Sequence, residues 1–128
     1  AEFSWAWPED GKRGSLRAIE PMTGNIKWEA KTDIPRMSGV LSTAGNLIFT
    51  GTQTGEFQAF NAETGDMLWE YQTGSGIVGQ PITWESDGTQ YVTILNGGGA
   101  VYALFAGDER LANVPTGGSV LTFALHGK

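Results

Sequence analysis

Two segments of the chain are variants of one pattern, and the distance between them constrains the fold more than any single residue. Residues 14–29 and 55–70 match at Gly, Ala, Thr, Gly, Trp and Glu with a constant offset of 41 residues. A repeat of about 40 to 45 residues built from short strands has the length of one four-stranded propeller blade. Because a single blade cannot bury both of its faces, the pattern predicts a chain that forms part of a ring.

The composition agrees with this architecture. The chain has 19 glycines and five tryptophans among its 128 residues, and Thr, Val, Ile and Phe are frequent, which favours strands and tight turns. No segment has the apolar periodicity of a helix. We therefore expect an all-β fold, a partial β-propeller of about two and a half four-stranded antiparallel blades. Its strands are expected at residues 47–51, 57–61, 67–73, 80–85 and 90–95.

A third copy of the pattern arrives late. Residues 118–125 resemble the start of the first copy, but their offset from Gly55 is 63 residues rather than 41. This predicts an insertion at about residues 96–117. We accordingly divide the chain into an N-terminal segment, 1–13, and propeller blades over 14–128. The sequence leaves open whether residues 1–3 are native or the remnant of a tag.

Two tryptophans occupy equivalent places in the repeat. Trp28 and Trp69 each follow, by four residues, the glycine of a Thr-Gly turn, Gly24 and Gly65. Their periodic placement predicts a structural role, in which each indole is buried between adjacent blades and its N–H donates to a carbonyl. Stacking on a ligand is the alternative.

Charge and residue content argue against several functions. The net charge is −6 and the eight Lys and Arg are scattered, so there is no basic stripe for nucleic acid. No apolar run has the length of a membrane span. The chain has no cysteine and one histidine, His126, so a Ser-His-Asp triad or a His-based metal cluster cannot be assembled within it.

Two glycine-rich segments deserve separate interpretations. Residues 74–79 satisfy the G-x-G-x-x-G pattern of dinucleotide sites, but that mechanism needs a helix to begin at the glycines, and residues 80–84 are typical of a strand. The segment is therefore interpreted as a crossing between blades. Residues 96–100, Asn-Gly-Gly-Gly-Ala, favour equally a flexible hinge and a close approach of backbone to a ligand.

The repeat also resembles a known family. Residues 14–24 with Trp28, residues 39–51 and residues 72–84 closely resemble the C-terminal part of pyrroloquinoline quinone (PQQ)-dependent alcohol dehydrogenases of the methanol and ethanol type. The resemblance covers about residues 14–128. It implies a parent eight-bladed propeller, exported to the periplasm, that holds PQQ and a calcium or lanthanide ion in its central funnel and oxidises primary alcohols to aldehydes.

The resemblance assigns only part of such a site to this chain. It implies that the catalytic aspartate and the metal ligands lie in earlier blades, so no catalytic or metal-binding residue is expected here. Met37 stands where the family often carries a tryptophan beside the cofactor. Gly99 and Ala100 match the stretch that borders the quinone, so these three residues are the expected cofactor contacts.

The expected partners follow from an incomplete ring. The chain should associate with the rest of the propeller, or with itself through open blade edges. The small alcohol substrate belongs to the parent enzyme, and the chain alone should neither retain PQQ nor oxidise alcohols. The alternative hypothesis is a non-catalytic PQQ-like propeller that serves as a scaffold or interaction module.

Overall fold

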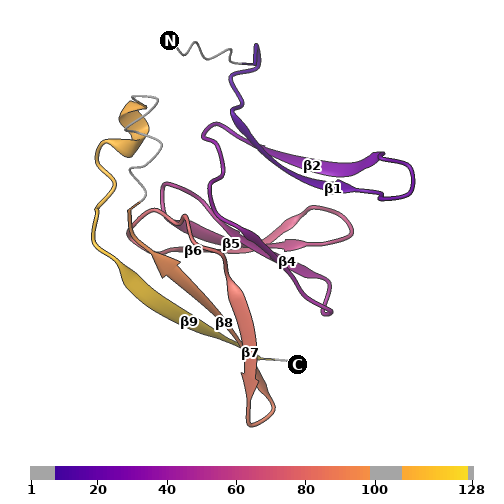
Figure 1. Ribbon diagram of the computed structural model, residues 1–128, viewed down its shortest axis with the longest axis vertical. Coiled ribbons are helices and arrows are strands. Elements are labelled where there is room, and N and C mark those ends of the chain that lie inside the picture. The colour runs from indigo at the N-terminus through magenta and orange to yellow at the C-terminus, as the bar shows by residue number, and fades with distance from the viewer. Residues whose placement is uncertain (1–7, 99–107, 127–128) are drawn as a thin grey trace.

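The chain forms three antiparallel sheets that follow one another in sequence (Figure 1). The computed structural model describes residues 8–98 and 108–126. The first sheet has two strands, the second four and the third three, and in each sheet the strands are hydrogen-bonded in chain order. The strands are β1 (Gly14–Ile19), β2 (Ile26–Thr32), β3 (Val40–Ser42), β4 (Leu47–Gly51), β5 (Glu56–Asn61), β6 (Met67–Gln72), β7 (Ile82–Ser86), β8 (Thr89–Asn96) and β9 (Ser119–Leu125).

Turn chemistry and strand register confirm the propeller arrangement that the repeat predicts. Asp87 and Gly88 have φ of 49° and 76°, the left-handed conformations that a tight β7–β8 hairpin requires. The cross-strand pair Ala18–Trp28 in the first sheet has the same register as Ala59–Trp69 in the second. The two sheets are thus copies of one unit, in which β1 and β2 correspond to β5 and β6.

One strand lies where the sequence analysis expected none. Val40–Ser42 forms β3, which pairs with β4 and completes the four-stranded second sheet. Strands β7 and β8 then begin the third sheet, and β9 takes the position beside β8 that β5 takes beside β4. The segment 74–79 crosses from β6 to β7 without a helix, which confirms its interpretation as a connection between blades.

The hydrophobic core lies between the second and third sheets. Alternate residues of β4, β5, β8 and β9 point into it, as expected for sheets that pack face to face, and Ile77 of the β6–β7 connection adds to it. Its buried members are Phe49, Phe57, Ala59, Ile77, Val92 and Ile94, with Leu41, Leu47, Leu121, Phe123 and Leu125 packed against them.

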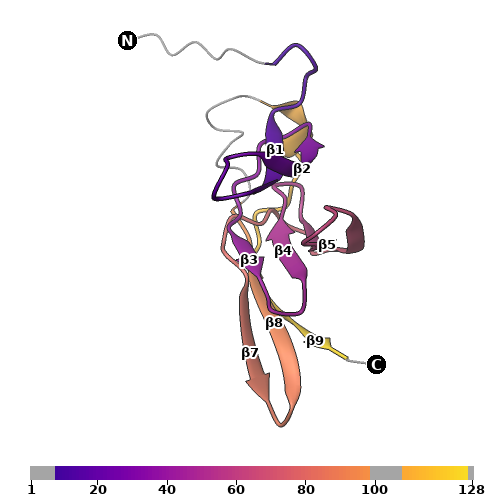
Figure 2. The ribbon, with the colours of Figure 1, turned by 90° about the vertical axis from the view of Figure 1, so that its right-hand side faces the viewer.

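The opposite face of the third sheet is exposed and apolar. Ile82 and Leu95 are 55% and 54% exposed, and Val120 is 68% exposed. The register places these side chains on one face, away from the core. The β7–β8 hairpin extends beyond the other sheets (Figure 2).

The connection between β8 and β9 returns toward the first sheet. It contains a short 3-10 helix, η1 (Glu109–Leu111), whose Leu111 is 1% exposed. Arg110 donates to the carbonyl of Asp33, the residue that follows β2, over 3.5 Å. Among the described residues, no helix is long and apolar enough to cross a membrane.

Candidate functional site

Three connections meet at one end of the sheets, and we call them the rim: residues 33–39 before β3, residues 73–81 between β6 and β7, and residues 97–98 after β8. The Ser38 hydroxyl donates to the carbonyl of Gly79 over 2.9 Å. The Gly97 amide donates to the carbonyl of Gly76 over 2.8 Å. The crossing 73–81 therefore joins the other two segments.

The rim carries the residue of the expected cofactor wall that the structure describes. Met37 is 43% exposed and lies in the loop before β3. Gly99 and Ala100 fall outside the described residues. Gly98, which precedes them, has φ of 67° and open space within 4 Å of where a Cβ would stand. The structure thus connects the Met37 loop through the crossing to the glycine segment, while the roles of Met37, Gly99 and Ala100 stay predictions.

A polar cavity of about 320 Å³ lies beneath the Met37 loop. Arg36 points into this region, where its Nη2 donates to Oε1 of Gln58 over 2.9 Å. Gln53 is 1% exposed and donates to the carbonyl of Pro35 over 2.7 Å, while its Oε1 accepts no hydrogen bond within the described part of the chain. The remaining lining residues include Thr32, Asp33, Ile34, Thr52, Thr54, Glu56, Glu70 and Arg110.

Burial shifts the pKa values of two charged groups in this cavity. The pKa of Arg36 is lowered, because burial disfavours its charged form more than the nearby Glu56 favours it. Burial acts to raise the pKa of Glu56, but the hydrogen bonds from the hydroxyls of Thr52 and Thr54, a backbone hydrogen bond and the charge of Arg36 together lower it, and the net shift of the pKa is downward.

The first tryptophan of the repeat rests on the following sheet. The Trp28 indole N–H donates to the carbonyl of Ala62 over 2.9 Å. A Cβ added to Gly65 would stand 2.6 Å from Cδ2 of that indole. The ring thus covers the turn after β5, which has room only for glycine at this point. Gly24 forms the equivalent turn in the first sheet, with nothing within 4 Å of its Cβ position.

Neither tryptophan is fully buried as the sequence analysis expected, because Trp28 is half-buried and Trp69 is more exposed still. Trp69 is 38% exposed, and its indole nitrogen makes no hydrogen bond to the described residues. Its ring contacts Phe123 edge-on at 5.1 Å and Phe57 at 6.0 Å. Tyr71 stacks on the ring at 6.1 Å, yet more than a third of the side chain stays exposed, so the expected burial of Trp69 is wrong for this chain.

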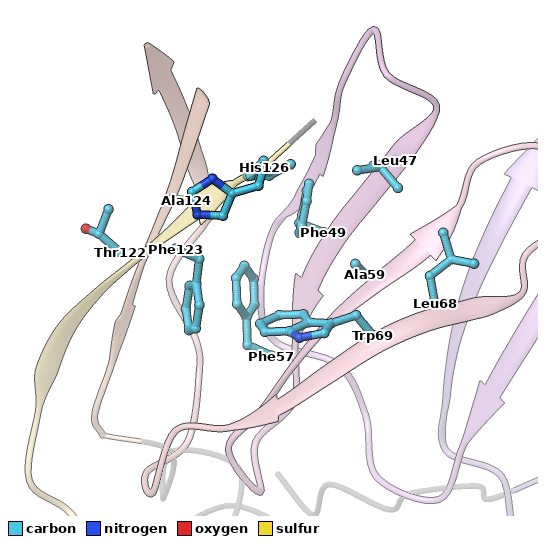
Figure 3. Close-up of a pocket in the computed structure, with 11 residues that line it drawn as sticks. Leu47, Phe49, Phe57, Ala59, Leu68, Trp69, Thr122, Phe123, Ala124 and His126 are labelled. Carbon is cyan, nitrogen blue, oxygen red and sulfur yellow. The ribbon is translucent and has the colours of Figure 1, made fainter. Parts of the chain in front are cut away.

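Trp69 lies in an apolar cavity of about 530 Å³ between the second sheet and β9. In Figure 3, Trp69, Phe57 and Phe123 point toward one another from the two walls, and His126 lies at the β9 side. The lining is almost entirely apolar, so this cavity has the character of a packing surface between blades rather than of a polar reaction centre. It does not include Met37.

Across residues 8–98 and 108–126, no three or more His, Asp or Glu side chains are grouped so that they could hold a metal ion. The features that sequence reasoning missed are Arg36, Gln53 and Ser38. No motif or spacing marks them, because their partners lie in other strands and turns.

Comparisons with known proteins place this geometry in a family. Residues 3–92 match the PQQ family model described as the glucose/ethanol/alcohol dehydrogenase beta-propeller domain. The chain belongs to this family. It is 50% identical over 114 residues to the quinoprotein alcohol dehydrogenase PedH of Pseudomonas putida, which covers 88% of this chain and 19% of that protein. It is also 50% identical over 118 residues to a quinoprotein ethanol dehydrogenase of Pseudomonas aeruginosa, which covers 91% of this chain and 19% of that protein.

A solved structure shows the same fold. A europium-containing methanol dehydrogenase superposes with a TM-score of 0.80 at 32% identity, over 91% of this chain and 24% of that one. This likeness confirms the partial β-propeller. The chain spans about one fifth of the length of the curated relatives it matches.

Proposed function

We propose that this chain is a segment of a periplasmic PQQ-dependent dehydrogenase that oxidises primary alcohols to aldehydes. The observation that carries the proposal is the identity of about one half, along 88% and 91% of the chain, to quinoprotein alcohol and ethanol dehydrogenases. The same identity weighs against the alternative of a non-catalytic scaffold. In this proposal the chain contributes part of the closed ring and one wall of the PQQ pocket.

The described rim residues fit one wall of a pocket for a flat aromatic quinone. Met37 offers an exposed thioether, and sulfur makes favourable contacts with aromatic rings. Gly98 leaves open space where a side chain would stand, so backbone can approach a planar ring closely. The proposal assigns Gly99 and Ala100 to the same wall, and assigns the calcium or lanthanide ligands and the catalytic carboxylate to other blades.

When bound, PQQ would supply the electron acceptor for the alcohol's hydride. The part of this chain is to bind and orient. Met37 would contact the face of the ring system and exclude water from it, and the glycine segment would border its edge. The rim connections would hold these two contacts at a fixed separation, which matters because small displacements of a reacting group are costly in rate.

The proposal is tested by PQQ binding to the longer protein that contains this segment. We expect saturable PQQ binding that requires calcium or a lanthanide, and a weaker affinity after Ala100→Phe, since a large side chain would crowd the quinone. The matched control is Ala44→Phe, because Ala44 is exposed in the β3–β4 turn at the other end of the sheet.

The 128-residue chain by itself provides the complementary measurement. Because it is expected to carry only one side of the PQQ pocket and no metal ligands, this chain should bind PQQ weakly. It should not reduce a dye with ethanol as the electron donor. Tight, saturable binding of PQQ by the chain alone would show that the cofactor site has been placed wrongly. Equal loss of affinity in Ala100→Phe and Ala44→Phe would contradict the assigned wall.

A further inference from the structure

The two neighbours of Met37 in the sequence are both anchored in the protein. Arg36 donates to Gln58 on β5, and its guanidinium carbon lies 5.6 Å from the ring centre of Phe60. Ser38 donates to the carbonyl of Gly79 in the blade crossing. The backbone of residues 36–38 is therefore fastened on both sides of the exposed Met37 side chain.

The Arg36 anchor has an unusual energetic character. Its guanidinium hydrogen-bonds to neutral acceptors, Oε1 of Gln58 at 2.9 Å and the carbonyl of Gly51 at 3.5 Å. Its Nε is buried and donates to none of the described residues. Burying a charge without a carboxylate in direct contact costs free energy. The benefit of the arrangement is a fixed orientation of the loop, because the planar guanidinium of Arg36 sets the directions of its hydrogen bonds.

The Ser38 anchor joins three parts of the chain through one oxygen. Its Oγ accepts from the amide of Gly51, at the end of β4, over 3.1 Å and donates to Gly79. Gly39, the next residue, packs so closely on Gln80 that an added Cβ would stand 2.8 Å from its side chain. The loop is thus attached both to its own blade and to the start of the next.

A third contact holds the loop from below. The buried Gln53, from the β4–β5 turn, donates its Nε2 hydrogen to the carbonyl of Pro35. Each of the residues 35, 36 and 38 therefore has a specific partner in a neighbouring element. Met37 alone projects, with 43% of its surface exposed.

We propose that Arg36 and Ser38 are positioning residues, which lock the backbone of residues 35–39 against β5 and the blade crossing so that Met37 is presented in one fixed orientation. This inference rests on the proposed function for its purpose, since a fixed Met37 is useful as a wall of the PQQ pocket. The locking of the loop is measurable without PQQ.

The chain has no cysteine, so a single introduced cysteine can be labelled specifically to measure the motion of the loop. Met37→Cys creates a single thiol for a nitroxide spin label, whose rotational motion is read by electron paramagnetic resonance. Met22→Cys is the matched control, because Met22 is 89% exposed in the β1–β2 turn, far from these anchors in sequence. We expect the label at position 37 to move more slowly than the label at position 22.

Removing an anchor should release the label at position 37 alone. Arg36→Met or Ser38→Ala should shorten its rotational correlation time by about twofold or more, with the label at position 22 unchanged. Arg17→Met is the control substitution, because Arg17 pairs with Glu29 on the surface of the first sheet. It should leave the label at position 37 unaffected.

The outcomes separate a positioning role from a general loss of structure. If Arg36→Met unfolds the chain, far-UV circular dichroism shows the loss of the sheets, and Ser38→Ala together with Gln58→Ala then decide the question. The proposal is overturned if the label at position 37 is already mobile in the chain that carries no further substitution. It is also overturned if the label does not respond to any of these three substitutions. Partial recovery of slow motion by Arg36→Lys would support it, because a lysine keeps the cation over Phe60.

A second readout distinguishes this inference from the proposed function. In the longer protein, Arg36→Met should raise the dissociation constant for PQQ by about tenfold, because a displaced wall contacts the ring poorly. If the spin label is released while PQQ affinity stays unchanged, the loop anchors stand and the cofactor role of Met37 is wrong. If neither changes, the positioning role is wrong.

Discussion

Adding one methyl group at Gly65 tests whether the Trp28 contact joins the first two sheets. Gly65 and Gly24 occupy equivalent turns with nearly identical backbones. Their φ angles are 78° and 74°, and each amide donates to the carbonyl four residues earlier, over 2.9 and 2.7 Å. They differ in one respect, since only Gly65 lies under an indole ring. Gly24→Ala therefore measures the backbone cost without the ring contact.

The expected free energies follow from this difference. A left-handed φ costs a non-glycine residue about 1 to 2 kcal/mol, so both variants should lose about that much. In Gly65→Ala the new Cβ would also stand 2.6 Å from Cδ2 and 2.7 Å from Cε3 of Trp28. Relieving that overlap must displace the indole and strain its bond to Ala62. Overpacking of this kind costs about 1 to 3 kcal/mol, which is the expected excess of Gly65→Ala over Gly24→Ala.

Urea denaturation of six proteins, in two double-mutant cycles that share Trp28→Ala, measures that excess. The free energies of unfolding of Gly24→Ala and Gly65→Ala are compared in the parent chain and again in a Trp28→Ala background. Without the indole, the two alanine substitutions should cost the same, because the overlap is gone. An equal cost in the parent chain, or an excess that persists without Trp28, would refute the docking contact.

Three further predictions concern other parts of the chain. Trp69→Ala should cost about 2 to 3 kcal/mol in urea denaturation, less than a fully buried aromatic, because the ring is 38% exposed; an unchanged midpoint would mean that the sheets do not pack through it. Hydrogen bonds from Arg110, followed by the charges of Arg110 and Arg13, lower the pKa of Asp108 from 3.8 to about 2. The ionised carboxylate thus adds stability above about pH 4 that is lost as the pH falls toward 2, so the unfolding free energy of Asp108→Asn should depend less on pH over that interval than that of the parent. Finally, the apolar outer face of the third sheet should cause self-association, and Val120→Lys should reduce the mass measured by light scattering; a monomeric parent chain at high concentration would contradict this.

The repeat allowed much of the fold to be predicted, because it encodes local features. The Thr-Gly turns and the strands expected at residues 47–51 and 57–61 each depend on residues close together in sequence. The offset of 63 residues also predicted that β9 follows a long connection. These features need no knowledge of which strands meet across the core.

The rest of the fold depends on contacts between distant residues. β3 has only three residues, too few for an alternation pattern to be recognised, and it is a strand because β4 pairs with it. The exposure of Trp69 is likewise a matter of what covers it, which the pattern around Trp69 does not state. Placing equivalent tryptophans in equivalent strands was therefore insufficient to predict equal burial.

The candidate site shows the same division. Met37 was found through a family resemblance at one position of a loop. The sequence does not identify Arg36 as a site residue, because a single arginine beside a proline matches no motif. Its anchoring role is visible only in the structure, where its Nη2 lies 2.9 Å from Oε1 of Gln58, 22 residues later in the chain.

The bond from Trp28 to Ala62 also bears on how such chains can change by duplication. Its donor and its acceptor belong to different repeats, so a cut between repeats separates the indole from the turn on which it packs. A transplanted repeat must therefore bring its own tryptophan and find a glycine-containing turn in its new neighbour. Recombination that preserves the 41-residue period would meet both conditions at the junction of the first two repeats, whereas an exchange in another phase would leave the indole without a turn to pack on.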